Sequence, residues 1–198
     1  MKFIIDDAED VWIYNEPFDY IHLRLMAGCF ADWPNLFRQT YDNLEPGGWL
    51  ELQDYGLPVK SFDGTHEGTN IMRWGETMCE AARKCGRPMG SETADLYPQH
   101  MADAGFVDIQ VRMLMWPTSG WPKDPVMKEL GRWNLMNCLD GLEGFCLALL
   151  TRALDWRKEE VDVFVAHVTK DFRDRRIHAY FPMPVCFGRK PFDHEMSQ

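Results

Sequence analysis

The chain has 198 residues, of which 45% are hydrophobic, and its formal net charge is -10. This length and apolar content suffice for one sizeable core, so we expect a single domain over residues 1–198. The acidic charge argues against nucleic-acid or anionic-membrane partners, since both require a basic surface. No stretch reaches the roughly 18 apolar residues of a membrane span. These observations predict a soluble protein of the cytoplasm, with the nucleus as the alternative.

Cysteine and histidine spacing argues against cross-links and metal sites. The six cysteines occur singly, without a Cys-x-x-Cys pair, which predicts reduced thiols and no disulfide framework. The six histidines fall on different predicted elements and lack an i, i+4 partner, so no metal site is expected.

The first half of the chain alternates short strands with amphipathic helices. Residues 18–23 are rich in aromatic and β-branched side chains and predict a strand, and residues 3–5 predict a shorter one. Apolar residues repeat every three or four positions over 32–43 and 69–85, which predicts two helices. A third strand is expected between them, at 49–53.

The second half predicts three more helices and two more strands. The helices are expected at 95–104, 122–154 and 158–172, and the strands at 106–115 and 177–187. Pro182 and Pro184 interrupt the last strand and predict an edge or bulged position there, because proline cannot donate a ladder hydrogen bond. The alternation of strands and helices indicates an α/β domain with a mainly parallel sheet.

One segment is more specific than this alternation. Residues 44–52 read Leu-Glu-Pro-Gly-Gly-Trp-Leu-Glu-Leu, which is a helix end, a Pro-Gly-Gly turn and a buried strand in succession. This order resembles the approach to the fifth strand in class I methyltransferases, which use S-adenosylmethionine (SAM).

Further motifs in a consistent order resemble the fungal LaeA-type methyltransferases of secondary metabolism. They are Ile5-Asp6-Asp7-Ala8-Glu9-Asp10, Phe18-Asp19-Tyr20-Ile21-His22-Leu23-Arg24, Asp32-Trp33, Trp121-Pro122-Lys123-Asp124-Pro125, Leu130-Gly131-Arg132-Trp133-Asn134, Arg173-Asp174-Arg175-Arg176-Ile177-His178-Ala179-Tyr180 and Gly188-Arg189-Lys190-Pro191. The resemblance covers nearly the whole chain. It implies a class I methyltransferase, Rossmann-like α/β sheet with flanking helices, and a helical, aromatic-rich lid at about residues 117–156.

The chain also differs from that family. Its members carry a further segment before Asp-Asp-Ala-Glu, with the first strand and a glycine-rich turn that holds SAM. We therefore expect a sheet that is incomplete at its N-terminal side, weak or no SAM binding, and no conventional cofactor. The resemblance assigns the remaining adenine-side contacts to Asp7, Ala8 and His22. The alternative for the acidic residues is a solvated turn.

An incomplete sheet would expose the apolar edge of the strand that contains Ile21. Two arrangements are predicted to cover it, and they can coexist. Residues 3–5 can pair beside residues 18–23 through a parallel crossover. A second copy of the chain can also cover the edge, which predicts a homodimer.

Candidate catalytic groups lie at the carboxyl ends of predicted strands, where open α/β sheets place ligands. His22 is a candidate acid or base, with a histidine hydrogen-bonded beside the sheet as the alternative. Asp54 and Tyr55 are candidates for positioning a hydroxyl or enol, with a helix cap and a packed ring as alternatives. Arg24 and His66 are candidate substrate contacts, although His66 also fits an ordinary loop residue.

A second histidine belongs to one of the shared motifs. His178 lies beside Arg175 and Arg176, and we interpret this group as structural, held by charge-assisted bonds to Asp171 or Asp174.

Large apolar side chains are unusually dense after residue 115. They include Trp116, Trp121, Trp133, Met136, Phe145 and Trp156. Helical spacing explains them as core packing. The alternative is a pocket under the lid for a planar, hydrophobic molecule, with Trp121 and Trp133 as candidate substrate contacts.

These observations leave three classes of function. We expect a methyltransferase-family protein of fungal secondary metabolism that has lost conventional SAM use. It would bind a hydrophobic, aromatic intermediate or act on it by coupling, cyclisation or isomerisation. The first alternative is a SAM-dependent methyltransferase completed by a partner chain or a missing N-terminal segment. The second is a regulatory pseudomethyltransferase that binds another protein.

Overall fold

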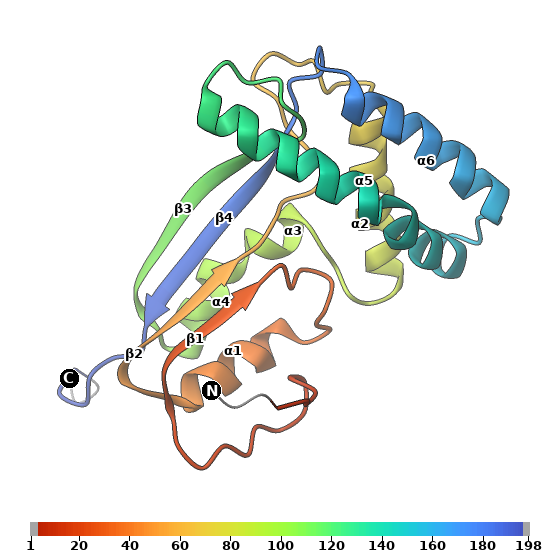
Figure 1. The fold of residues 1–198 in the computed structure, drawn as a ribbon. Helices are drawn as coiled ribbons and strands as arrows, with labels where there is room; N and C mark the ends of the chain where they lie inside the picture. The colour runs from red at the N-terminus through yellow and green to blue at the C-terminus, as the bar shows by residue number, and fades with distance from the viewer. Residues whose placement is uncertain (1–3, 196–198) are drawn as a thin grey trace.

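A computed structural model describes residues 4–195 as a four-stranded sheet with six helices (Figure 1). The strands are β1 (Phe18–Arg24), β2 (Leu44–Gln53), β3 (Val107–Pro117) and β4 (Tyr180–Arg189). The helices are α1 (Trp33–Asp42), α2 (Asn70–Lys84), α3 (Ser91–Ala94), α4 (Tyr97–Ala104), α5 (Pro125–Ala153) and α6 (Lys158–Arg173). Each predicted element after residue 17 is present with shifted bounds, and only the single turn of α3 was not expected.

Three helices begin where the sequence supplies a capping side chain. Asp32, Thr69 and Asp124 accept hydrogen bonds from the backbone N–H three residues later, at the starts of α1, α2 and α5. Pro125 occupies the first turn of α5, where its missing N–H costs no helical bond. These local signals explain why helix positions follow from the sequence.

The strand order is β1-β2-β4-β3. β1 and β2 run parallel, whereas β4 runs antiparallel to both β2 and β3. The prediction of a mainly parallel sheet was therefore wrong, and the sheet is mixed. Alternation along the chain identifies strands but not their directions. Here β4 follows the helices α5 and α6 in the sequence and lies between β2 and β3 in the sheet.

The Pro-Gly-Gly turn lies inside β2 instead of before it. The pairing with β1 passes from Phe18 opposite Leu44 to Tyr20 opposite Trp49, so residues 45–48 form a bulge. Gly47 has a φ of 86°, in the left-handed region that glycine adopts without strain. The strand predicted at 49–53 therefore starts at Leu44.

β4 as a whole lies inside the sheet, between β2 and β3, but its two prolines lie where only β3 pairs with it, which agrees with the edge position predicted for that part. The ladder between β4 and β2 ends at Val185, and the two prolines lie beyond this point. The carbonyls of Pro182 and Pro184 accept bonds from the N–H groups of Gly56 (2.6 Å) and Asp54 (3.2 Å) in the loop after β2. Because N–H and C=O of one strand residue point to the same side, each missing proline N–H faces this loop and not the β3 ladder.

The first predicted strand is not formed by the residues that the structure describes. Phe3 lies outside the described residues, and Ile4 and Ile5 are exposed and belong to no strand. Within residues 4–195, the outer edge of β1 has no strand beside it. The crossover predicted to cover this edge is thus not seen.

Two apolar cores organise the molecule. One lies between the sheet and the helices α1 and α4, where Leu50 and Leu52 of β2 contact residues such as Phe37 and Tyr97. The other joins α2, α5 and α6 to the start of β4 and includes Met78, Leu150, Val161, Phe172 and Phe181.

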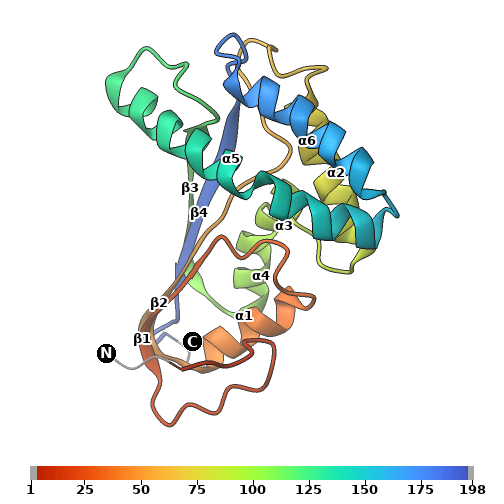
Figure 2. The same cartoon turned by 45° about the vertical axis from the view of Figure 1, so that its right-hand side comes forward.

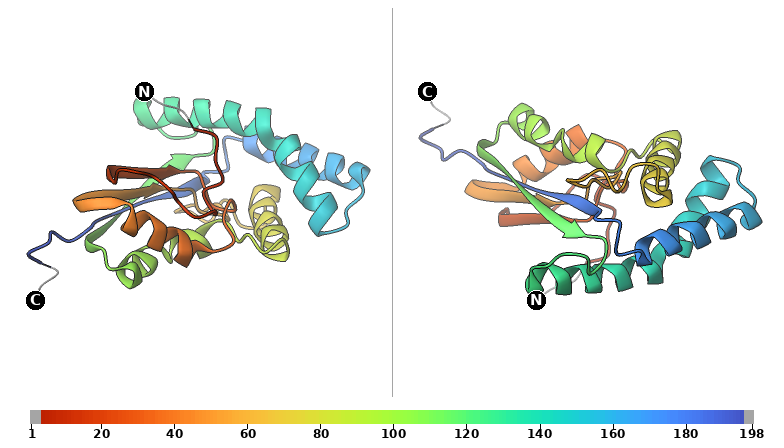
Figure 3. Two further views of the ribbon diagram at one scale, coloured as in Figure 1. Left: turned by 90° about the horizontal axis from the view of Figure 1, so that it is seen from below. Right: turned by 90° about the horizontal axis from the view of Figure 1, so that it is seen from above.

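These cores place helices unequally on the two faces of the sheet. With the sheet nearly edge-on, α1, α3 and α4 lie on one face (Figure 2). Views from below and above show the first half of α5 on the opposite face, crossing one end of the strands (Figure 3).

Candidate functional site

A cavity of about 300 Å³ lies where α5 crosses the ends of the strands. Its lining residues are Leu25, Tyr55, Trp74, Trp116, Asn134, Asn137, Cys138, Gly141, Leu142, Phe145 and Phe181. Leu25 and Tyr55 follow the carboxyl ends of the parallel strands β1 and β2, and Trp116 pairs with Phe181 across β3 and β4. The cavity thus lies where open α/β sheets bind ligands.

One face of α5 forms the roof of this cavity. Asn134, Cys138, Gly141 and Phe145 recur at intervals of three and four residues, which places them on the same side of the helix. A Cβ atom built on Gly141 would meet no atom within 4 Å. The same is true of Gly144, which does not line the cavity. The roof therefore has open space beside Gly141.

Aromatic rings form much of the remaining wall. The ring of Trp74 lies 6.3 Å from Phe181 in a T-shaped arrangement and 6.4 Å from Phe145. Tyr55 also meets Phe181 edge to face, at 6.4 Å. Such walls favour planar, apolar ligands, which gain burial and edge or face contacts.

Several polar groups of the wall are already bonded within the protein. The indole N–H of Trp74 donates to the sulfur of Cys146 at 3.1 Å, and the amide nitrogen of Asn134 donates to the carbonyl of Pro117 at 2.9 Å. The hydroxyl of Tyr55 and the amide of Asn137 have no hydrogen-bond partner in the described part of the chain. Burial raises the pKa of Tyr55, with the nearby Asp54 charge adding to the effect, so its hydroxyl stays protonated at neutral pH.

Asp54 supports the cavity from behind. Its side chain is buried, at 2% exposure. It accepts hydrogen bonds from the backbone N–H groups of Met26 (3.0 Å), Ala27 (2.7 Å) and Tyr55 (3.0 Å) and from the hydroxyl of Tyr97 (3.0 Å). Burial raises the pKa of Asp54, while these bonds act to lower it. Asp54 is not a helix cap; it binds the backbone of Met26 and Ala27, the two residues after Leu25. Leu25 itself has a φ of 55°, which is unusual for a residue other than glycine.

His22 lies on the sheet face opposite α1 and outside the cavity. Its Nδ1 atom lies 3.3 Å from the hydroxyl of Tyr20 and 3.5 Å from a carboxylate oxygen of Glu51. Arg24, two residues later, places its guanidinium 5.9 Å from the ring centre of Trp116, a cavity residue. Arg24 is therefore the only one of the two that reaches the wall of the cavity.

Asp7 and Ala8 form a local turn near the start of α1. The carboxylate of Asp7 accepts the N–H of Glu9 at 2.9 Å, and the carbonyl of Ala8 accepts the indole N–H of Trp12 at 3.0 Å. Glu9 fastens this turn to the backbone N–H of Ala31 at 2.7 Å. Neither Asp7 nor Ala8 lines the cavity.

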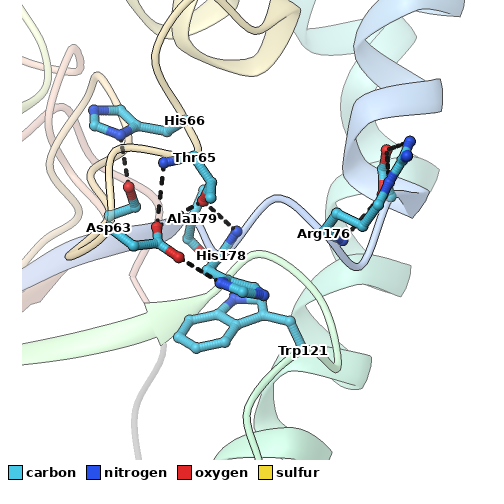
Figure 4. Close-up of polar contacts among 9 residues, drawn as sticks. Asp63, Thr65, His66, Trp121, Arg176, His178 and Ala179 are labelled. Atoms are coloured by element: carbon cyan, nitrogen blue, oxygen red, sulfur yellow. Dashed lines mark hydrogen bonds and ion pairs between the residues drawn. The ribbon is translucent and has the colours of Figure 1, made fainter.

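Hydrogen bonds made by polar side chains connect the loop after β2 to the residues just before β4 (Figure 4). Asp63 bonds the ring of His178 at 2.6 Å and the hydroxyl of Thr65 at 2.8 Å. The bond to His178 holds the pKa of Asp63 well below its usual range. The indole N–H of Trp121 donates to the carbonyl of Ala179 at 2.9 Å.

The same figure shows two further contacts of this region. Arg176 makes a two-pronged contact with Asp174, with nitrogen–oxygen distances of 2.9 and 2.6 Å, as expected for a structural group. The ring of His66 bonds the hydroxyl of Ser61 at 2.8 Å. Neither His66 nor Trp121 is a cavity residue.

Of the predicted site residues, the structure brings only Tyr55 into the cavity wall, with Asp54 and Arg24 directly behind it. Trp133 is 63% exposed on the outer side of α5. Among the lining residues that sequence reasoning missed are Trp74, Asn137, Gly141 and Phe181. Asn137 and Gly141 lie on α5. They could have been found because polar and small residues recur there every three or four positions within an apolar helix.

No group of three or more His, Cys, Asp or Glu side chains between residues 4 and 195 is arranged to hold a metal ion. In the same range, no helix combines the length and the apolar character needed to cross a membrane. All six cysteines are free.

Comparison with known proteins places the chain in a family. A family model described as a methyltransferase domain matches residues 1–111. The probable methyltransferase tdiE of Emericella nidulans is 38% identical over 186 residues, which cover 93% of this chain and 58% of that protein. Methyltransferase pytC of Aspergillus terreus is 38% identical over 193 residues, covering 97% of this chain and 59% of that protein.

A regulator is also among the relatives. The secondary metabolism regulator LAE1 of Cochliobolus heterostrophus is 33% identical over 93% of this chain and 61% of its own length. The chain thus spans 58 to 61% of the length of these three relatives. Among solved structures, a putative methyltransferase from Bacillus halodurans has 16% identity and a TM-score of 0.47, over 96% of this chain and 78% of that chain.

The family-model match and the curated relatives confirm the resemblance that the sequence motifs predicted. The sheet with flanking helices confirms the predicted α/β class. Because the family model covers more than half of the 198 residues, the chain belongs to the methyltransferase-domain family, with LaeA-type proteins among its relatives.

Proposed function

We propose that this chain binds a hydrophobic, aromatic metabolite of fungal secondary metabolism in the cavity under α5, and that by itself it does not carry out conventional SAM-dependent methylation. The cavity is the observation that carries the proposal, because five of its eleven lining residues are aromatic and no charged side chain lines it. The names of the relatives, two methyltransferases and a secondary metabolism regulator, support the metabolic setting.

The residues described here do not fit SAM well. The 198 residues contain no Gly-x-Gly sequence, with which a strand-to-helix turn approaches a nucleotide closely. The three residues that the resemblance assigned to the cofactor, Asp7, Ala8 and His22, are bonded to local partners and lie outside the cavity.

The chemistry available in the cavity is that of shape and hydrogen bonding. Tyr55 and Asn137 offer neutral polar groups, and the aromatic walls orient a planar molecule. These features support a role in guiding coupling, cyclisation or isomerisation of a bound intermediate. They equally support binding without turnover.

Calorimetric titration tests the SAM part of the proposal. We expect no saturable binding of SAM or S-adenosylhomocysteine to the 198-residue chain in the micromolar range, because these residues contain no Gly-x-Gly turn that would let the backbone approach the cofactor. A cooperative thermal transition of the same sample would show that the absence of binding is not due to unfolding. Micromolar binding would contradict the proposal and favour a SAM-dependent methyltransferase.

We also infer that a second copy of the chain covers the free edge of β1. This edge has no partner strand within the described residues, and Tyr20 on it is 52% exposed. Light scattering is expected to give a mass of twice 23.1 kDa. The mass of one chain at every concentration tested would exclude the homodimer.

A further inference from the structure

The polar groups of the cavity narrow the class of ligand that it can hold. We propose that the cavity binds a neutral aromatic compound with a carbonyl oxygen, and that this oxygen accepts a hydrogen bond from the hydroxyl of Tyr55. This inference rests on the proposed function, since it concerns the same cavity. It adds the charge of the ligand, its polar group and the residue that recognises it.

The wall of the cavity carries no charged side chain. None of the lining residues is ionised at neutral pH: burial raises the pKa of Tyr55 and raises that of the Cys138 thiol to about 12. The carboxylate of Asp54 already accepts four hydrogen bonds from other residues. Arg24, whose guanidinium lies 5.9 Å from the ring centre of Trp116, is exposed to solvent and is not a lining residue. A charged ligand would therefore lose its hydration and gain at most a counter-ion that is screened by solvent.

The polar groups of the wall differ in whether the protein already satisfies their hydrogen bonds. The indole of Trp74 and the amide nitrogen of Asn134 are already bonded to protein acceptors. The hydroxyl of Tyr55, the indole N–H of Trp116 and the amide of Asn137 have no partner in the described part of the chain. Two of these three groups act mainly as donors, so the complementary ligand presents acceptor oxygens.

Tyr55 is the most firmly held of these three residues. It follows the end of β2, its ring is held edge to face against Phe181, and its backbone N–H is anchored to Asp54 at 3.0 Å. A hydroxyl on such a support has a defined position, whereas Asn137 is exposed on α5. Tyr55 is therefore the group that fixes the orientation of the ligand.

Three probes with one ring system test the inference. They are 2-acetylnaphthalene, which is neutral and has a carbonyl, 2-ethylnaphthalene, which lacks it, and 2-naphthoate, which is charged. The acetyl compound is expected to bind about three- to tenfold more tightly than the ethyl compound, the size of one neutral hydrogen bond. The naphthoate is expected to bind at least about tenfold more weakly than the acetyl compound.

Removal of one hydroxyl assigns the effect to a residue. Tyr55→Phe keeps the ring and is expected to erase the preference for the acetyl over the ethyl compound. Tyr180→Phe removes a hydroxyl outside the cavity, on a ring stacked 5.1 Å from Phe62, and should leave all three affinities unchanged.

The outcomes separate this inference from the proposed function. Equal binding of the acetyl and ethyl compounds to the unaltered chain, or a preference that survives Tyr55→Phe, would overturn the role of Tyr55 while leaving an aromatic ligand in place. Tightest binding of 2-naphthoate would overturn the neutral ligand. Failure of all three probes to bind would overturn the proposed function together with the inference.

Discussion

Replacing Gly141 by tryptophan is expected to weaken the binding of 2-acetylnaphthalene by more than about tenfold, because the indole would fill the space in which the ligand is held. Gly141 lines the cavity, and a Cβ atom there meets nothing within 4 Å. The variant should therefore fold normally. Its free energy of unfolding should even rise by up to about 0.5 kcal/mol, because glycine is a poor residue for a helix interior.

Gly144→Trp is the matched control for this experiment. Gly144 lies three residues further along α5, its Cβ position is equally open, and it is not a cavity residue. Fluorescence titration with the same probe should give an affinity within about twofold of the unaltered chain. If Gly141→Trp binds the probe normally, or if both variants lose binding equally, the cavity is not the binding site.

Asp54→Ala is expected to lower the free energy of unfolding by about 4 kcal/mol, as measured by denaturant unfolding. The carboxylate is buried and accepts bonds from the N–H groups of Met26, Ala27 and Tyr55 and from the hydroxyl of Tyr97. Alanine would leave these donors without a partner. Each buried donor left unsatisfied costs about 1–3 kcal/mol.

Two further variants define what Asp54 does. Asp54→Asn keeps the shape but can accept on only one side, so a loss of about 2 kcal/mol is expected. Asp95→Ala removes an exposed carboxylate next to α3 and should change stability by less than about 0.5 kcal/mol. An Asp54→Ala protein as stable as the unaltered chain would show that the carboxylate does not hold the loop after β1.

The candidate site could be predicted only in part. Asp54 and Tyr55 were identifiable because they follow a buried strand, and strand ends are where α/β sheets place ligands. Their different roles could not be read from position alone. Both lie in the extended segment just beyond β2, where consecutive side chains point to opposite sides, so Asp54 faces Tyr97 while Tyr55 faces the cavity.

The aromatic residues show the same limit. In the sequence, nothing distinguishes the expected burial of Trp116, Trp121 and Trp133. In the structure, Trp116 lines the cavity, Trp121 bonds the carbonyl of Ala179, and Trp133 is exposed on α5. Residue type predicts that such rings will be buried somewhere, but the surface that buries each one is contributed by distant segments.

Local patterns in the sequence determined where the helices and strands lie. Apolar spacing and the caps Asp32, Thr69 and Asp124 act within one or two turns, so α1, α2 and α5 follow from neighbouring residues alone. The ordered motifs likewise determined the family, which the match over residues 1–111 confirms.

Only the tertiary structure decided the direction of β4, the free edge of β1 and the cavity itself. Each depends on contacts between segments far apart in the chain, such as Trp116 opposite Phe181 and Trp74 beside Phe145. No periodicity within a short window carries that information, because hydrophobic burial is non-directional and many pairings would satisfy it. Chain packing selects one of them, and that choice creates the site.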